Sequence, residues 1–366
     1  MTFQFSPVYT YLSVRLLSPP KLMSTAPTVR TLAAALGLSR TTVSEALRGS
    51  ACVRPDTAAR IRAAAEAAGY RPNPLVGAVM SEVRRSRNQM FRGVIAAVDL
   101  DEAERPPAGA RFHAALTAGA QKRAGELGFK LEAFLVGRKG VTLPRLDTIL
   151  QSRGIQGVLL LPSWATPDFT KLDWSHYAGI YADYAIEHPA LHAVCSDHHR
   201  SLMLALARLR TLGYRRPGIV LQKHQDERLQ HRWEGAFTAY QRNHPEIGTV
   251  PPLIVPELNE AAFTKWFRNY DPDVVLGHSP EIISWMNAAG ARVPKTHGYF
   301  CLNVTMADRP CAGLDLHPHA LGARGIELLI AQLQRNERGI PQPASTTMIP
   351  GHWVDGPTLR TTGQRV

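Results

Sequence analysis

Cysteine is scarce and long apolar runs are missing in this 366-residue chain. The four cysteines, Cys52, Cys195, Cys301 and Cys311, form no C-x-x-C pair and no regular framework. A disulfide scaffold and a structural zinc site are therefore not expected, and free thiols fit a reducing cytoplasm. No stretch of about 18 apolar residues occurs, so the sequence predicts no membrane-spanning helix.

Sequence patterns for catalysis and for metal binding are missing as well. The chain holds no G-x-S-x-G, no P-loop and no G-x-G-x-x-G fingerprint. Its histidine clusters, "DHHR" at 197–200 and "LHPHAL" at 316–321, lack a firm ligand spacing such as H-E-x-x-H. We therefore expect no enzymatic activity, no cofactor and no bound metal.

The first 22 residues are the nearest approach to an export signal. They centre on the apolar run "VYTYLSVRLL", but Arg15 interrupts this run and no small-x-small cleavage site is obvious. The preferred interpretation is a disordered leader over residues 1–23, with translation starting at Met1 or Met23. A secretory signal is the alternative.

Positive charge is concentrated near the N-terminus. The formal net charge is +12; residues 21–92 carry 12 Lys and Arg against 4 Asp and Glu, whereas residues 93–366 carry 29 against 26. This asymmetry indicates a basic head that binds a polyanion and a nearly neutral body with another task. A solvated basic face is the alternative that charge alone leaves open.

Three short helical patterns follow one another in the basic segment, which we take as a domain over residues 24–70. In the first pattern Thr28 is a suitable N-cap, and Leu32 and Leu36 repeat with helical spacing. Gly37 then supplies a tight bend, because glycine adopts a positive φ without strain.

The second pattern is rich in hydroxyl groups. Ser39 is its expected N-cap, and Val43 and Ala46 form its inner face. A helix, a glycine turn and a second helix make the helix-turn-helix arrangement, whose second helix enters the major groove of DNA. Hydroxyls at that helix start can donate to phosphates, and Arg40 can reach the edge of a guanine. A third helix is expected from Pro55.

The stretch "TVRTLAAALGLSRTTVSEALRGS…VRPDTAARIRAAAEAAGYRPNPL" resembles the DNA-binding head of the lac repressor (LacI/GalR) family of bacterial transcription regulators. The resemblance implies a homodimer that binds a palindromic double-stranded operator and usually represses transcription. It places base contacts on Arg40, Thr41 and Glu45, and phosphate contacts on Thr28, Ser39, Thr42, Ser44 and Arg48.

Two residues depart from the pattern of the family. Glu45 stands where arginine is usual, and a carboxylate there can accept a hydrogen bond from cytosine N4 but repels phosphate. Arg54 replaces the usual Ser or Thr before Pro55, so the third helix should start without a side-chain acceptor.

Residues 71–91 are expected to form a hinge. In the family this segment is a short helix that orders on the operator and inserts an apolar side chain into the minor groove. A plain flexible linker with arginines for solubility is the alternative. The resemblance places the hinge contacts on Asn73, Val76, Val79 and Met80.

From residue 92 onward, apolar strand patterns alternate with amphipathic helices. The runs "GVIAAVDL" (93–100), "GVLLLP" (157–162) and "RPGIVLQ" (216–222) read as buried strands, and residues 227–243 read as part of one helix. Such alternation predicts parallel sheets covered on both faces, and two sets of it predict two similar lobes around a cleft.

This body resembles the effector-binding core of the same family, which has the fold of periplasmic sugar-binding proteins. The expected core spans residues 92–360. Its first lobe comprises about 92–187 and 313–335, and its second lobe about 188–311 and 340–360. The resemblance places effector contacts on Arg232 in "RWEGAF", Asp197, His278 and Asn303.

The expected fold is an α-helical helix-turn-helix head joined to an α/β two-lobed, periplasmic-binding-protein-like core with parallel sheets flanked by helices. The expected function is that of a cytoplasmic transcription regulator, a repressor whose operator affinity is controlled by a small molecule, a sugar, bound between the lobes. The alternatives are a solute-binding protein of sugar transport or sensing without DNA binding, and a sugar-modifying enzyme.

Overall fold

The computed structural model describes residues 29–47, 53–68, 91–103, 105–184 and 187–360. They belong to two separate compact units, one up to Asn88 and one from Gln89 onward. The helices of the N-terminal unit are α1 (Val29–Leu36), α2 (Arg40–Leu47) and α3 (Pro55–Ala67).

The N-terminal unit is held together by a small apolar core that all three helices share. Leu32 of α1, Val43 and Ala46 of α2, and Ile61 of α3 are buried in it. The turn between α1 and α2 contains Gly37 at φ +64, which confirms the predicted left-handed bend. These observations confirm the predicted order of helix, turn, helix and helix.

Arg54 precedes α3 and makes no side-chain cap to that helix, as the sequence predicts. Pro55 occupies the first helical position, where a missing N–H costs nothing.

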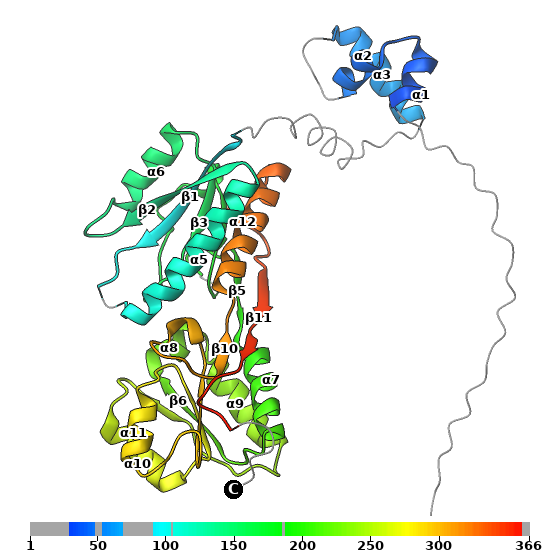
Figure 1. The fold of residues 1–366 in the computed structure, drawn as a ribbon. Helices are drawn as coiled ribbons and strands as arrows, with labels where there is room; N and C mark the ends of the chain where they lie inside the picture. The colour runs from blue at the N-terminus through cyan, green and yellow to red at the C-terminus, as the bar shows by residue number, and fades with distance from the viewer. Residues whose placement is uncertain (1–28, 48–52, 69–90, 104, 185–186, 361–366) are drawn as a thin grey trace, which may run out of the picture. The chain divides into compact units, whose positions relative to one another are not determined.

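The C-terminal unit is built on two sheets of six strands each (Figure 1). The first sheet is parallel throughout. Its residues from Ile95 to Val98 are fully buried, because helices cover both faces of a parallel sheet. In spatial order the strands are β11 (Thr346–Pro350), β5 (His192–Asp197), β4 (Ala178–Tyr181), β3 (Gly157–Leu160), β1 (Gly93–Leu100) and β2 (Phe129–Val136).

The second sheet is parallel except at one edge, where β12 runs antiparallel to β10. The mixed edge arises because β12 directly follows β11 of the other sheet. In spatial order the strands are β12 (His352–Val354), β10 (Gly313–Asp315), β9 (Gly298–Cys301), β8 (Val274–Gly277), β6 (Pro217–Gln222) and β7 (Leu253–Val255).

Each sheet carries its own helices and forms one lobe. The first lobe has α5 (Pro107–Glu126), α6 (Leu143–Ser152), η1 (Trp174–His176) and α12 (Pro318–Arg335). The second lobe has α7 (His198–Thr211), α8 (Lys223–Arg228), α9 (Arg232–Asn243), α10 (Glu260–Tyr270), α11 (Ile282–Ala288) and η2 (Val304–Met306).

The chain crosses between the lobes after β5, β10 and β11 (Figure 1). The predicted lobe boundaries were wrong at these crossings. β5 and β11 belong to the first sheet rather than the second lobe, and β10 belongs to the second sheet rather than the first lobe. An apolar run predicts a buried strand but not which of two similar sheets that strand joins.

The single helix expected over residues 227–243 was also wrong. α8 ends at Arg228 and α9 begins at Arg232, because Gln230 and His231 adopt left-handed conformations with φ of 55 and 56. Within the described residues, the helices are all too short or too polar to cross a membrane.

Candidate DNA-binding surface and ligand cavity

The outer face of α2 is polar. Arg40 and Thr41 are exposed, and Ser44 and Glu45 are partly exposed. Arg40 and Ser44, like Thr41 and Glu45, are four residues apart and therefore neighbours on one helix face. Since Val43 and Ala46 lie in the core, the polar face of α2 is turned away from that core.

The start of α2 is fixed by Ser39. Its Oγ accepts a hydrogen bond from the backbone N–H of Thr42 at 3.1 Å and lies 2.8 Å from the Thr42 hydroxyl. This is the predicted N-cap. Ser39 remains exposed, so its hydroxyl can also take part in an external contact.

Several predicted contacts lie outside the described residues. These predictions concern the phosphate contacts of Thr28 and Arg48 and the hinge contacts of Asn73, Val76, Val79 and Met80.

In the C-terminal unit, a cavity of about 90 Å³ lies between the two lobes. By the same measure one water needs roughly 10–15 Å³, so the cavity holds on the order of six to nine waters. Its polar lining from the first lobe is Arg105, His113, Ser163, Trp164, Asp183, Cys195 and Ser196, and that from the second lobe is His198, Gln225, Arg228, Trp233, His278 and Asn303.

Two of the four predicted effector contacts, His278 and Asn303, line this cavity. The other two have different surroundings. The Arg232 guanidinium lies over the Tyr184 ring, 4.6 Å from its centroid, and the Asp197 carboxylate caps α7 by accepting from the Arg200 N–H at 3.0 Å. The structure therefore places Arg232 and Asp197 beside the cavity lining rather than in it.

Sequence reasoning missed His198, Arg228 and Trp233, which also line the cavity. The "DHHR" cluster did single out His198, but only as a poor metal site. Arg228 was not chosen because the resemblance places the effector arginine three residues before Gly235, at Arg232. Because Gln230 and His231 adopt left-handed conformations between α8 and α9, Arg228 and Arg232 have different surroundings.

An aromatic cluster forms the wall of the second lobe. Trp233 is fully buried and lies edge-on to the rings of His198 and His278, with centroids 4.9 and 5.9 Å away. Burial, reinforced by the Arg228 charge, lowers the pKa of His198 to about 3 and that of His278 to about 4. Both imidazoles are therefore neutral at pH 7.

The wall of the first lobe is held by charge pairs. Arg105 donates to the carboxylates of Asp99 and Glu102, at 2.7 and 2.8 Å. Glu102 also accepts from the Trp164 N–H at 2.7 Å. His113 contacts the Pro162 carbonyl through Nε2 at 2.9 Å. The loops at the ends of β1 and β3 are thereby fixed around the cavity.

Among the described residues, the following polar contacts join the lobes directly. Arg228 of α8 pairs with Asp183, which follows β4. His224 Nε2 lies 2.7 Å from the Trp164 carbonyl, and Arg111 of α5 donates to the carbonyl of Met306. We call these three pairs the interlobe contacts, because they must shift whenever the lobes move apart.

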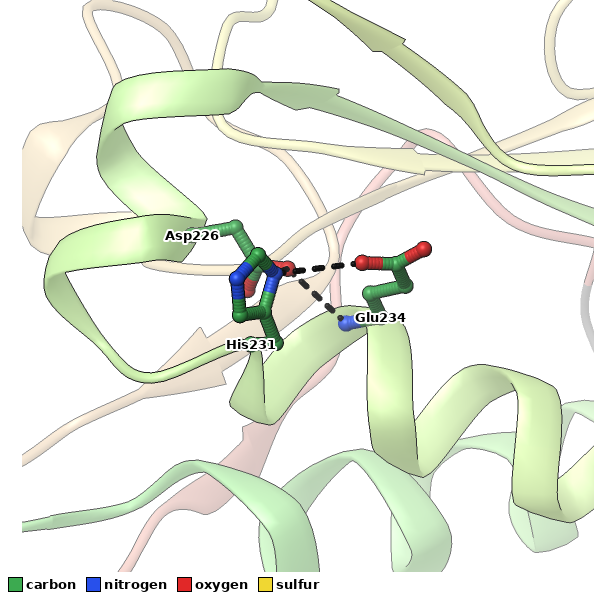
Figure 2. A group of neighbouring side chains, drawn as sticks. All are labelled: Asp226, His231 and Glu234. Atoms are coloured by element: carbon green, nitrogen blue, oxygen red, sulfur yellow. Dashed lines mark hydrogen bonds and ion pairs between the residues drawn. The ribbon is translucent and has the colours of Figure 1, made fainter.

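Asp226 anchors the start of α9 beneath this wall. Its buried carboxylate accepts from the N–H group of Trp233 at 3.1 Å. It also accepts from the N–H group of Glu234 at 3.3 Å (Figure 2). Asp226, His231 and Glu234 each bring a potential metal-ligand atom within 4.8 Å of the others. Because Asp226 is engaged with the backbone and His231 pairs with Glu234 at 3.2 Å, we assign this group to helix capping.

The N-terminal part of the chain matches a protein-family model. Residues 28–73 match the sequence model described as bacterial regulatory proteins, lacI family. No curated protein matches the chain in sequence.

Solved structures match most of the chain in fold. The complex of the transcriptional regulator CelR with cellobiose has 20% identity and a TM-score of 0.52, covering 91% of this chain and 99% of its own. The lac repressor dimer bound to operator and the anti-inducer ONPF has 16% identity and a TM-score of 0.52, covering 92% and 100%. The regulator CcpA of Lactococcus lactis has 12% identity and a TM-score of 0.55, covering 73% and 99%.

The helix-turn-helix unit and the family match over residues 28–73 agree, and the two-lobed core has the fold of these regulators. The N-terminal unit is therefore similar to the lacI family of bacterial regulatory proteins over residues 28–73, and the C-terminal unit shares the fold of the solved regulators.

Proposed function

We propose that this protein is a cytoplasmic repressor, that it binds a palindromic operator as a homodimer, and that a small sugar-type ligand controls its affinity for that operator. The observation that carries the proposal is the exposed polar face of α2 on a basic three-helix unit, in a chain that also has a cavity between two lobes.

Base reading is assigned to the outer face of α2. Arg40 can donate two hydrogen bonds to guanine, and Glu45 can accept from cytosine. The Thr41 hydroxyl can donate to or accept from the edge of a base. Ser39, Thr42 and Ser44 lie at the positive N-terminal half of the helix, where hydroxyls and backbone N–H groups favour phosphate.

Ligand control is assigned to the interlobe cavity. A ligand that fits only one arrangement of the lobes shifts the equilibrium between arrangements by its differential affinity, and such couplings are typically about 1–3 kcal/mol. The interlobe contacts support this switch, because they connect cavity residues of one lobe to the other. The complex of CelR with cellobiose favours a sugar as the ligand class.

The proposal is tested by selecting duplexes from a random pool on the purified full chain and measuring binding by fluorescence anisotropy. Discrimination between selected and scrambled duplexes, with a palindromic selected sequence, is the expected result. Equal binding of both duplexes would reject sequence-specific recognition and leave a ligand-binding protein without a DNA target.

A further inference from the structure

The wall of the second lobe holds polar atoms that lack partners. Five buried side-chain polar atoms of the described residues have no hydrogen-bond partner, and three of them belong to residues that line the interlobe cavity: His198 Nδ1, Arg228 Nε and Trp233 Nε1. An unsatisfied buried donor costs roughly 1–3 kcal/mol, so such atoms are rare and need an explanation. A ligand bound in the cavity explains these atoms if it forms hydrogen bonds with them.

Two of these atoms can only donate. The indole Nε1 and the guanidinium Nε each carry a hydrogen and have no free lone pair. Arg228 already gives Nη1 to Asp183, and a guanidinium carries five donors, so Nε remains available without breaking that pair.

Negatively charged acceptors for ligand hydroxyls are scarce among the described residues of the same cavity, although the neutral imidazoles of His198 and His278 and the Gln225 amide can also accept. Asp183 is the one carboxylate among the described lining residues, and it is held by Arg228. The Ser196 hydroxyl donates to the Leu316 carbonyl, and the Asn303 Oδ1 accepts from the Thr305 N–H. A hydroxyl must donate as well as accept, whereas a carboxylate only accepts.

We propose that the ligand is a sugar acid of monosaccharide size, whose carboxylate accepts hydrogen bonds from Arg228 Nε and Trp233 Nε1 in the wall of the second lobe. The proposal deepens the ligand-control function above and rests on it. Charge-assisted hydrogen bonds to such donors are the strong ones, and the cavity volume of about 90 Å³ is several times the roughly 10–15 Å³ that one water needs.

The test compares matched ligands on the full chain. Isothermal titration is carried out with D-glucose, D-gluconate and D-glucuronate, and with D-galactose, D-galactonate and D-galacturonate. At least one acid is expected to bind about tenfold or more tightly than its neutral parent, the ratio that a single charge-assisted hydrogen bond produces.

Two variants identify the donors. Trp233→Phe keeps the ring and removes Nε1–H, and Arg228→Lys keeps the charge that faces Asp183 but removes Nε–H. Each should lower the affinity for the acid about tenfold more than it lowers the affinity for the neutral parent. Arg242→Lys, on the exposed side of α9, is the control and should behave as the wild type. Melting curves without ligand show whether each variant folds.

Equal affinity for acids and neutral parents would overturn the carboxylate inference and leave the proposed sugar control standing. Failure of every ligand in the panel would also overturn the inference, while discrimination of operator duplexes by the same preparation would keep the DNA-binding proposal. Loss of affinity for acid and neutral parent alike in both variants would show that Arg228 and Trp233 shape the cavity rather than recognise a carboxylate.

Discussion

At the scale of single residues, the cavity is lined by two histidines, His198 and His278, whose imidazole rings are neutral at pH 7. His198 is 7% exposed, and its pKa of about 3 lies below the ordinary value near 6.5. Desolvation disfavours the charged ring, and Arg228 and Arg232 oppose its protonation further. Folding therefore excludes a proton that the unfolded chain binds below pH 6.5.

This linkage predicts a stability that falls as the solution is acidified from about pH 6.5 toward pH 4. In that range the unfolded chain binds the proton and the folded chain does not, so His198 contributes up to about 1.4 kcal/mol per pH unit. His198→Asn should flatten the pH dependence of the free energy of unfolding by that amount, as measured with urea. The exposed neighbour His199 provides the matched control, His199→Asn. Equal slopes in the two variants would contradict the account.

A second residue-scale prediction concerns Arg40 on the polar face of α2. Arg40→Ala should cost about 1–3 kcal/mol of operator binding and relax the preference at one or two base pairs, because a bidentate guanine contact is lost. Arg62→Ala, on the exposed side of α3, is the control. Equal weakening on every duplex would instead make Arg40 a phosphate contact. Anisotropy titrations on single-base variants of the selected duplex distinguish these results.

At the scale of elements, the first lobe depends on the close approach of α5 and α12. A Cβ atom added at Gly322 of α12 would lie 2.0 Å from the Leu116 carbonyl oxygen of α5. This contact is with backbone, which cannot swing aside as a side chain can. Glycine is therefore required here for packing rather than for a turn.

Gly322→Ala should destabilise the core by about 1–3 kcal/mol, the usual cost of overpacking. Gly125 of α5 offers the opposite case, because nothing lies within 4 Å of its added Cβ. Gly125→Ala should stabilise the core by roughly 0.5–1 kcal/mol, since alanine is the better helix former. Thermal melting of the two variants tests both predictions. An unchanged melting temperature of Gly322→Ala would reject the packing argument.

Features that are determined by neighbouring residues could be predicted from the sequence, whereas features that depend on residues far apart could not. The head was predictable because glycine, caps and apolar spacing act within a few residues, as at Gly37 and Ser39. Of the four predicted effector contacts, only His278 and Asn303 line the cavity. The break at Gln230 and His231 is stabilised by the carboxylate of Asp226, which caps α9 through the N–H groups of Trp233 and Glu234 and is no usual N-cap position. The sheet that β5 joins depends on long-range pairing.

At the scale of the whole molecule, the proposed homodimer requires an apolar surface on the core. Leu204 of α7 is 57% exposed and Met348 of β11 is 44% exposed, and β11 is an edge strand of its sheet. Two exposed apolar side chains on α7 and β11, elements that contact each other, favour association with a partner more than the single exposed Leu135 at the opposite edge. We place the dimer contact on this side of the core.

The double variant Leu204→Asp, Met348→Asp should therefore shift the protein from dimer to monomer in sedimentation velocity, because burying two carboxylates at an interface is unfavourable. Leu135→Asp provides the control, since Leu135 is 40% exposed on β2 at the opposite edge of the same sheet. A double variant that sediments as the wild type would place the dimer contact elsewhere.

The most direct test of the central claim is the affinity of the full chain for its selected duplex, measured with and without a ligand that raises the melting temperature of the core. Coupling of about 1–3 kcal/mol corresponds to a change in affinity of roughly 5- to 150-fold. The account predicts a change of this size on the selected duplex. An operator affinity that stays constant at saturating ligand would contradict it.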